Sequence, residues 1–203
     1  MMAKISESVE IRWPRADDRL LRKAVDWSSA ITFSNYSAER HALILNGYFQ
    51  AGHALVDHCQ RNTYERQVMI YPILFCYRHA LEMAMKWIVS SYGRPFGVSP
   101  EPDHDLWQLW ESCKAIFTQI DDEGAAVSTS TVERLVKEFH DLDIRAQAFR
   151  YSVTRKGDLL RLPDIAVDLI NLRDVMQGLE NFFSGADGYL DHLCSASNEM
   201  QYY

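Results

Sequence analysis

The chain has 203 residues, of which 47% are hydrophobic and 24% are charged. This is ordinary globular composition, and a chain of this length can bury a core of its own, so a mainly disordered state is excluded. Nine Gly and six Pro are too few for a turn-rich all-β fold. The net charge of −7 argues against non-specific coating of nucleic acid, because phosphate binding needs an excess of Lys and Arg. We therefore expect a single globular domain over residues 1–203, with any anion site confined to a local patch.

The cysteines and the apolar segments indicate the compartment. The four Cys are widely spaced and form no Cys-x-x-Cys motif, which favours buried thiols in a reducing environment. The N-terminus lacks the apolar segment of a signal peptide. The longest apolar stretch, near residues 69–77, is interrupted by Pro72 and is too short to span a membrane. These features predict a soluble cytoplasmic protein.

The N-terminal third of the chain begins with a weakly alternating segment, residues 1–13, which we expect to be an extended arm. Apolar residues at helical spacing then predict a helix from Pro14 to Trp27. A second, longer helix is expected from Ser37, a good N-cap, to Cys59.

The most hydrophobic segment follows and predicts a third helix. Asn62 and Glu65 have the spacing of a capping box, and Gly93 should end the helix. Pro72 should either kink this helix or mark its true beginning.

Three further helices and one irregular segment are expected beyond Gly93. Asp103 should cap the next helix, and Ser130 with Glu133 should open another. Pro163 and Asp164 should start a long last helix with a break at Gly185 or Gly188.

The segment from 148 to 162 breaks the helical pattern. Two short β-type runs, FRYSV and LLRL, flank TRKGD, which predicts a hairpin-like excursion. The fold class is therefore all-α, a bundle of five to six helices with this excursion. The large apolar members of each helical stripe should form its core: Leu74, Leu81, Met85, Leu109, Trp110, Phe139, Ile170 and Phe183.

Arg78, Glu82 and Lys86 lie four residues apart in sequence and should share one helical face. This face is either solvated or a polar cluster inside the bundle. The second interpretation requires partners from another element, because buried charges must be paired. His104, Asp105 and Arg150 supply suitable groups, so we expect Arg78 or Glu82 to reach at least one of them.

The same polar residues are candidates for chemistry. His104 stands just after a proline-rich loop and could act as an acid or base, or simply neighbour a helix cap. Arg150 and Tyr151 lie in the non-helical segment, where functional residues are common. Arg150 could equally hold loop carbonyls.

Metal and nucleotide chemistry find little support in the sequence. His53, Asp57 and His58 have i, i+4, i+5 spacing, so two ligands could share one helical face, but a third ligand is absent. No phosphate-binding glycine motif, nucleophile elbow or zinc-protease motif occurs. We expect no metal and no cofactor.

Three segments carry a resemblance to a known group of proteins: IYPILFCYRHALEMAMKWIV, HDLWQLW and AFRYSVTRKG. Together they resemble the HEPN-type superfamily of helical proteins over about residues 66–160. Such proteins are frequent in bacterial toxin–antitoxin, abortive-infection and other phage-defence loci, and many are metal-independent ribonucleases. The resemblance implies an RNA-binding or RNA-cleaving protein that works as a homodimer.

Catalytic members of that superfamily carry an Arg followed, after a short spacer, by a His. RLVKEFH matches this pattern, so the resemblance implies that Arg134 binds phosphate and that His140 moves the proton of the 2′-hydroxyl. The site could instead be assembled from Arg78, Glu82, His104 and Arg150. Two other functions stay open: a non-catalytic helical module, such as an antitoxin, regulator or subunit that binds a partner protein from the same locus, and an unrelated all-α enzyme. The acidic net charge favours the binding module.

Overall fold

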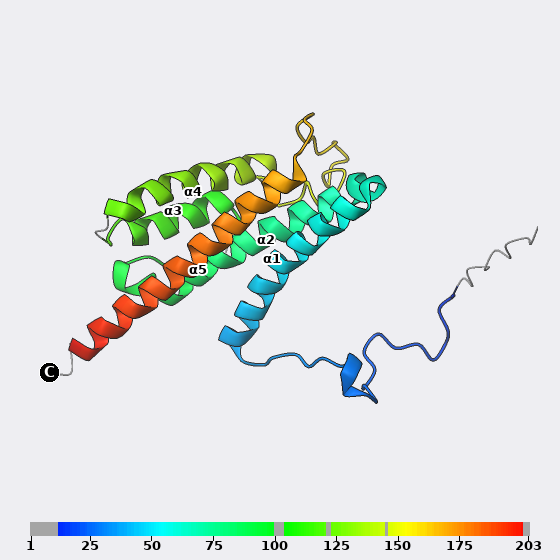
Figure 1. The fold of residues 1–203 in the computed structure, drawn as a ribbon, viewed down its shortest axis with the longest axis horizontal. Coiled ribbons are helices and arrows are strands. Elements are labelled where there is room, and N and C mark those ends of the chain that lie inside the picture. The colour runs from blue at the N-terminus through cyan, green and yellow to red at the C-terminus, as the bar shows by residue number, and fades with distance from the viewer. Residues whose placement is uncertain (1–11, 100–103, 121–122, 145, 201–203) are drawn as a thin grey trace, which may run out of the picture. The chain divides into compact units, whose positions relative to one another are not determined.

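The computed structural model describes residues 12–99, 104–120, 123–144 and 146–200, which belong to two compact units. The first unit lies within residues 1–34 and the second within residues 35–203. Most of the arm expected over residues 1–13 lies outside the described residues. The second unit is all-α and contains five α-helices, and its described residues include no strand longer than a single bridge (Figure 1).

The described part of the first unit contains only one short 3-10 turn, Trp27–Ser29, capped by the Asp26 side chain. The prediction of a helix from Pro14 to Trp27 is therefore wrong. Leu20, Leu21 and other large apolar side chains of its stripe are exposed. A helix this short is only marginally stable in water unless its apolar face is buried.

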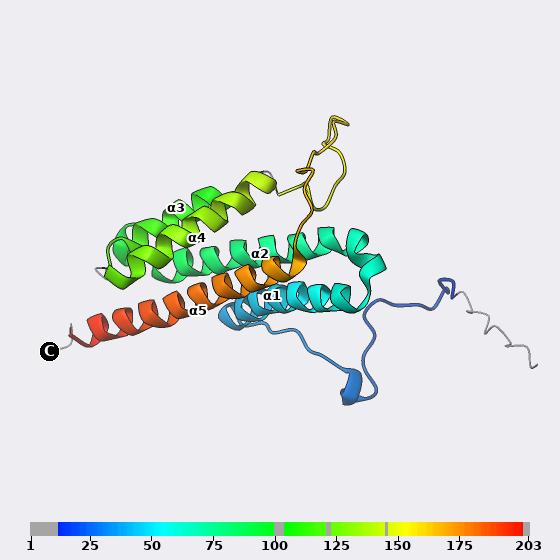
Figure 2. The same ribbon diagram turned by 45° about the horizontal axis from the view of Figure 1, so that its top comes forward.

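The second unit begins with two long helices, α1 (Ser37–Arg61) and α2 (Arg66–Tyr92), which lie side by side and are joined by a short 3-10 turn (Figure 2). Gly52 of α1 makes their close contact possible. An added Cβ at this position would lie 2.4 Å from the ring of Tyr77. Pro72 lies inside α2, near its beginning.

Helices α3 (Leu106–Phe117) and α4 (Glu123–Leu142) lie beside each other, and α3 packs on α2. Asp105 is the observed N-cap of α3, whereas the expected cap, Asp103, lies outside the described residues. Helix α4 begins at Glu123, seven residues before Ser130, so the expected start of this helix is wrong. Glu123, Ala125 and Ala126 are good helix formers in this added stretch and favour its helical conformation despite Gly124.

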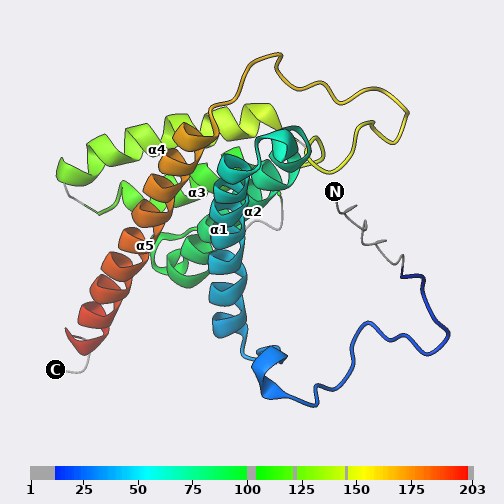
Figure 3. The same ribbon diagram turned by 45° about the vertical axis from the view of Figure 1, so that its right-hand side comes forward.

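The segment between α4 and α5 is non-helical and loops away from the helices (Figure 3). It contains the expected hairpin-like excursion, in which Val153 and Leu159 form an isolated antiparallel bridge. Gly157 supports the tight turn with a φ of 88°.

Helix α5 (Leu169–Met200) packs on both α1 and α2. It begins five residues after Asp164, because the Asp168 side chain caps it by accepting from the backbone N–H groups of Ile170 and Asn171. The expected break at Gly185 or Gly188 does not occur.

The core of the second unit is contributed by all five helices and is densest around α2. Seven of the eight predicted core residues are buried. Ile170 is the exception, with 56% of its surface exposed in the first turn of α5. None of the helices in the described part of the chain combines the length and apolar character needed to cross a membrane.

Candidate functional site

A buried ion pair on α2 forms the centre of the candidate site. Arg78 and Glu82 stand one helical turn apart, and Arg78 Nη1 donates to Glu82 Oε2 at 3.2 Å. Their side chains are only 4% and 3% exposed. The solvated-face interpretation is therefore wrong for these two residues, and their charges need partners from other elements.

Two such elements reach Arg78. Its Nη2 donates to the carbonyl oxygens of His104 at 2.9 Å and Asp143 at 3.4 Å. The buried Asp143 carboxylate lies 3.7 Å from Arg78 Nε and caps the turn after α4 by accepting from the N–H groups of Gln147 and Ala148. Arg78 thus links α2 to the segment before α3 and to the end of α4.

The Glu82 carboxylate contacts two basic side chains, those of Lys86 and His104. Its Oε1 lies 2.8 Å from Lys86 Nζ and 2.7 Å from His104 Nδ1. Burial alone would raise the pKa of Glu82, but the hydrogen bonds from Lys86 and His104 hold that pKa below its ordinary value. The expected contact between the Arg78/Glu82 pair and His104 is therefore confirmed.

A small cavity of about 140 Å³ opens beside this cluster, and Arg78, Glu82, His104 and Arg150 all line it. We call this cavity, together with these four residues, the His104 site. The His104 side chain is 69% exposed, although its Nδ1 is held by a buried carboxylate. Such a carboxylate orients an imidazole and selects its tautomer.

Arg150 lies at the same cavity but is held differently from Arg78. Its Nε and Nη2 donate to the carbonyl oxygen of Ala146, so the expectation that it could hold loop carbonyls is confirmed. The guanidinium also lies over the rings of Phe75 and Tyr151, at 5.9 and 5.5 Å from their centroids. These contacts orient a side chain that remains exposed and able to meet an anion.

The two motif residues on α4 do not line this cavity. Arg134 is 62% exposed and pairs with Glu138 at 2.6 Å. His140 is largely buried, and its Nδ1 lies 3.3 Å from Asp105 Oδ1, the atom that caps α3. Their spacing of six residues places them on different faces of the helix.

Sequence reasoning missed three residues of the site, Asp143, His79 and Phe75. Asp143 follows the last turn of α4, and an Asp at a helix end followed by a turn was the only available signal. His79 stacks on Phe75 with ring centroids 5.9 Å apart, and burial lowers its pKa. The sequence offers no signal that distinguishes these two rings from the other residues of an apolar helical stripe.

The described residues contain no group of three or more His, Cys, Asp or Glu side chains arranged to hold a metal ion. His53 is buried, with its Nδ1 at 2.9 Å from Tyr77 Oη and its Nε2 at 3.1 Å from Glu180 Oε2. His58 pairs with Glu65, and Asp57 pairs with Arg173. The three residues considered as metal ligands are therefore engaged with different partners.

Comparisons of the chain with family models, with curated proteins and with solved structures found no match.

Proposed function

We propose that the protein is a metal-independent ribonuclease of the HEPN-like defence type, and that the His104 site performs its chemistry. The observation that carries the proposal is the geometry of His104, an exposed imidazole whose Nδ1 lies 2.7 Å from the buried Glu82 carboxylate. With Nδ1 carrying the proton, Nε2 is the basic nitrogen. The resemblance of three sequence segments to that superfamily supports the same reaction class.

The proposed step is attack of an RNA 2′-hydroxyl on the adjacent phosphorus. His104 takes the hydroxyl proton, a bond forms between the 2′ oxygen and phosphorus, and the bond from phosphorus to the 5′ oxygen breaks. The leaving oxygen receives a proton from a protonated imidazole or from water. Arg150 binds the phosphate oxygens, and Lys86 adds positive charge beside Glu82. A homodimer would double the site without changing its chemistry.

Single variants test this assignment by cleavage of an unstructured RNA in the presence of EDTA. We expect His104→Ala to lower the rate by about a hundredfold or more, the usual scale for loss of a general base. His58→Ala is the matched control, because His58 is also a histidine at least partly exposed to solvent and paired with a glutamate, Glu65, at 2.6 Å. Its cleavage rate should be unchanged.

The rival assignment to the α4 motif is tested in the same assay. Arg134→Ala and His140→Ala should leave cleavage within a fewfold of wild type if the His104 site acts. Loss of activity in these two variants with activity retained in His104→Ala would move the reaction to α4. An absence of cleavage by folded wild-type protein would end the ribonuclease proposal.

The second candidate is a non-catalytic helical binding module, such as an antitoxin or a subunit of a defence complex. Two observations favour it: the net charge of −7, and the pairing of Arg78 and Glu82 with each other and with neighbouring groups inside the protein. A purely structural cluster would have the same contacts. Its signature is loss of stability in Arg78→Ala with no change in any measured activity.

A further inference from the structure

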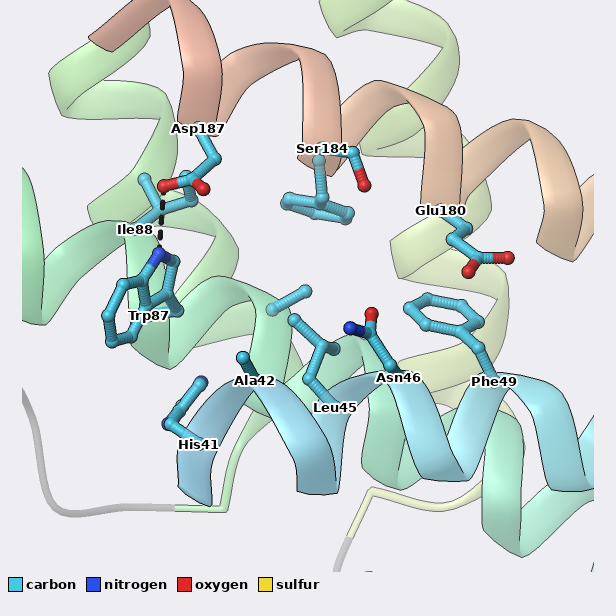
Figure 4. A pocket seen from close by; sticks show the side chains of 12 residues that line it. His41, Ala42, Leu45, Asn46, Phe49, Trp87, Ile88, Glu180, Ser184 and Asp187 are labelled. Carbon is cyan, nitrogen blue, oxygen red and sulfur yellow. Dashed lines mark hydrogen bonds between the residues drawn. The ribbon is translucent and has the colours of Figure 1, made fainter. Parts of the chain in front are cut away.

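A second cavity, of about 230 Å³, lies between α1, α2 and α5 and shares no lining residue with the His104 site. Its walls are mainly apolar and include Leu45, Phe49, Ile88 and Phe183. Figure 4 shows the side chains of α1 and α5 facing one another across it. A concave, mainly apolar cavity with a few polar groups is the usual form of a small-molecule site.

The polar groups of this cavity are dominated by two carboxylates of α5. Glu180 and Asp187 are seven residues apart, two helical turns, so they share a face and lie about 10.5 Å apart along the helix axis. In Figure 4 they stand at opposite ends of the cavity, with Ser184 between them. The lining includes no Lys or Arg.

Each carboxylate is oriented through one of its oxygens. Asp187 Oδ1 accepts from Trp87 Nε1 at 2.8 Å and from Tyr92 Oη at 2.6 Å. Glu180 Oε2 lies 3.1 Å from His53 Nε2 and accepts from Gln177 Nε2 at 3.0 Å. No donor among the described residues contacts the second oxygen of either group. Two positioned acceptors thus remain available to a ligand.

The one histidine that lines the cavity does not offset these charges. His41 lies 2.9 Å from the carbonyl oxygen of Met83 through its Nε2, and burial lowers its pKa, so it is neutral near pH 7. The cavity is therefore negative at both ends and apolar between them, which is the complement of a flexible dication.

We propose that this cavity binds a short linear aliphatic diamine. One ammonium group would contact Asp187 beside the Trp87 ring, and the other would contact Glu180, while the methylene chain packs on Leu45 and Phe183. If the two carboxylates are separated by this axial spacing and both ammonium–carboxylate contacts of about 2.8 Å lie along it, about 5 Å is left between the nitrogens. Diamines with four or five methylene groups reach this separation. The site is independent of the proposed ribonuclease activity.

Calorimetric titration of the full chain with 1,5-diaminopentane, at about 0.15 M salt to screen weak surface attraction, tests the proposal. Glu180→Gln and Asp187→Asn each remove one charge and should weaken binding about tenfold or more. Asp174→Asn is the matched control, because Asp174 is an exposed acid of the same helix that does not line the cavity. Its affinity should equal that of wild type.

Two further measurements separate a diamine site from simpler alternatives. Pentylamine has the same chain with one ammonium group and should bind about tenfold more weakly. Ala42→Phe keeps both carboxylates, fills the slot from an exposed position of α1 and should abolish binding. The proposal is overturned if folded wild-type protein gives no binding heat, if Asp174→Asn weakens binding as much as Glu180→Gln, if pentylamine binds equally well, or if Ala42→Phe binds normally.

Discussion

Arg78–Glu82 and Arg134–Glu138 are the same residue types at the same helical spacing, but only the first pair is buried. Arg78→Ala leaves the Glu82 and Asp143 carboxylates without their guanidinium and should lower the free energy of unfolding by about 3–5 kcal/mol. Arg134→Ala removes only an exposed helix pair and should cost about 0.5 kcal/mol or less. Urea unfolding of the two variants measures the difference. Equal costs would mean that burial of the first pair does not stabilise the fold.

The lowered pKa of Glu82 makes part of the stability depend on pH. Because the folded pKa lies below the ordinary value of 4.5, the contribution is present above that pH and is lost as the pH falls through the folded pKa. Unfolding experiments between pH 7 and pH 3 should show this loss. In Glu82→Gln the same decline should be smaller, although the variant is less stable at pH 7. A decline as steep as that of wild type would assign the effect to other carboxylates.

At the scale of elements, two glycines of α1 offer a direct test of the contact between α1 and α2. A Cβ at Gly52 would meet the Tyr77 ring at 2.4 Å, whereas a Cβ at Gly47 would meet no atom within 4 Å. Gly52→Ala should therefore lower the free energy of unfolding by about 1–3 kcal/mol. Gly47→Ala should raise it by about 0.5–1 kcal/mol, because alanine is the better helix former. Thermal or urea unfolding checks both signs, and stabilisation by Gly52→Ala would show that the two helices separate at low cost.

The helices also show which structural features can be predicted from the sequence and which cannot. Helical spacing was sufficient for α2 and for the shared face of Arg78 and Glu82, because these depend on residues within a few turns of one another. The role of Asp143 could not be predicted, because its contact with Arg78 joins positions 65 residues apart. Apolar spacing also led to two wrong predictions, the burial of Ile170 and a helix from Pro14 to Trp27. A periodic pattern gives the apolar face of a helix but not whether another element covers it.

At the scale of the whole molecule, the two units differ in how far their large apolar side chains are buried. Among the described residues, the core of the second unit lies between Leu45 and Cys194. In the first unit the aromatic side chains of Trp13, Trp27 and Phe33 are exposed. Exposed apolar side chains that gather into one patch are typical of surfaces that contact other molecules. The folding of the helical unit and the association behaviour of the chain should therefore depend on different residues.

This separation predicts the effect of removing residues 1–34. The remaining chain keeps every residue of the core, so its urea midpoint should match that of the full chain and its far-ultraviolet circular dichroism per residue should become more helical. It should also bind less of a dye that reports exposed apolar surface, because the deletion removes, among the described residues, seven exposed large apolar side chains: Trp13, Leu20, Leu21, Val25, Trp27, Ile31 and Phe33. A full-length variant with Trp13, Trp27 and Phe33 changed to Ser is the control and should reproduce the lower dye signal without changing the midpoint. A broad or lowered transition in the shortened chain alone would contradict the prediction, because residues 1–34 would then stabilise the helical unit.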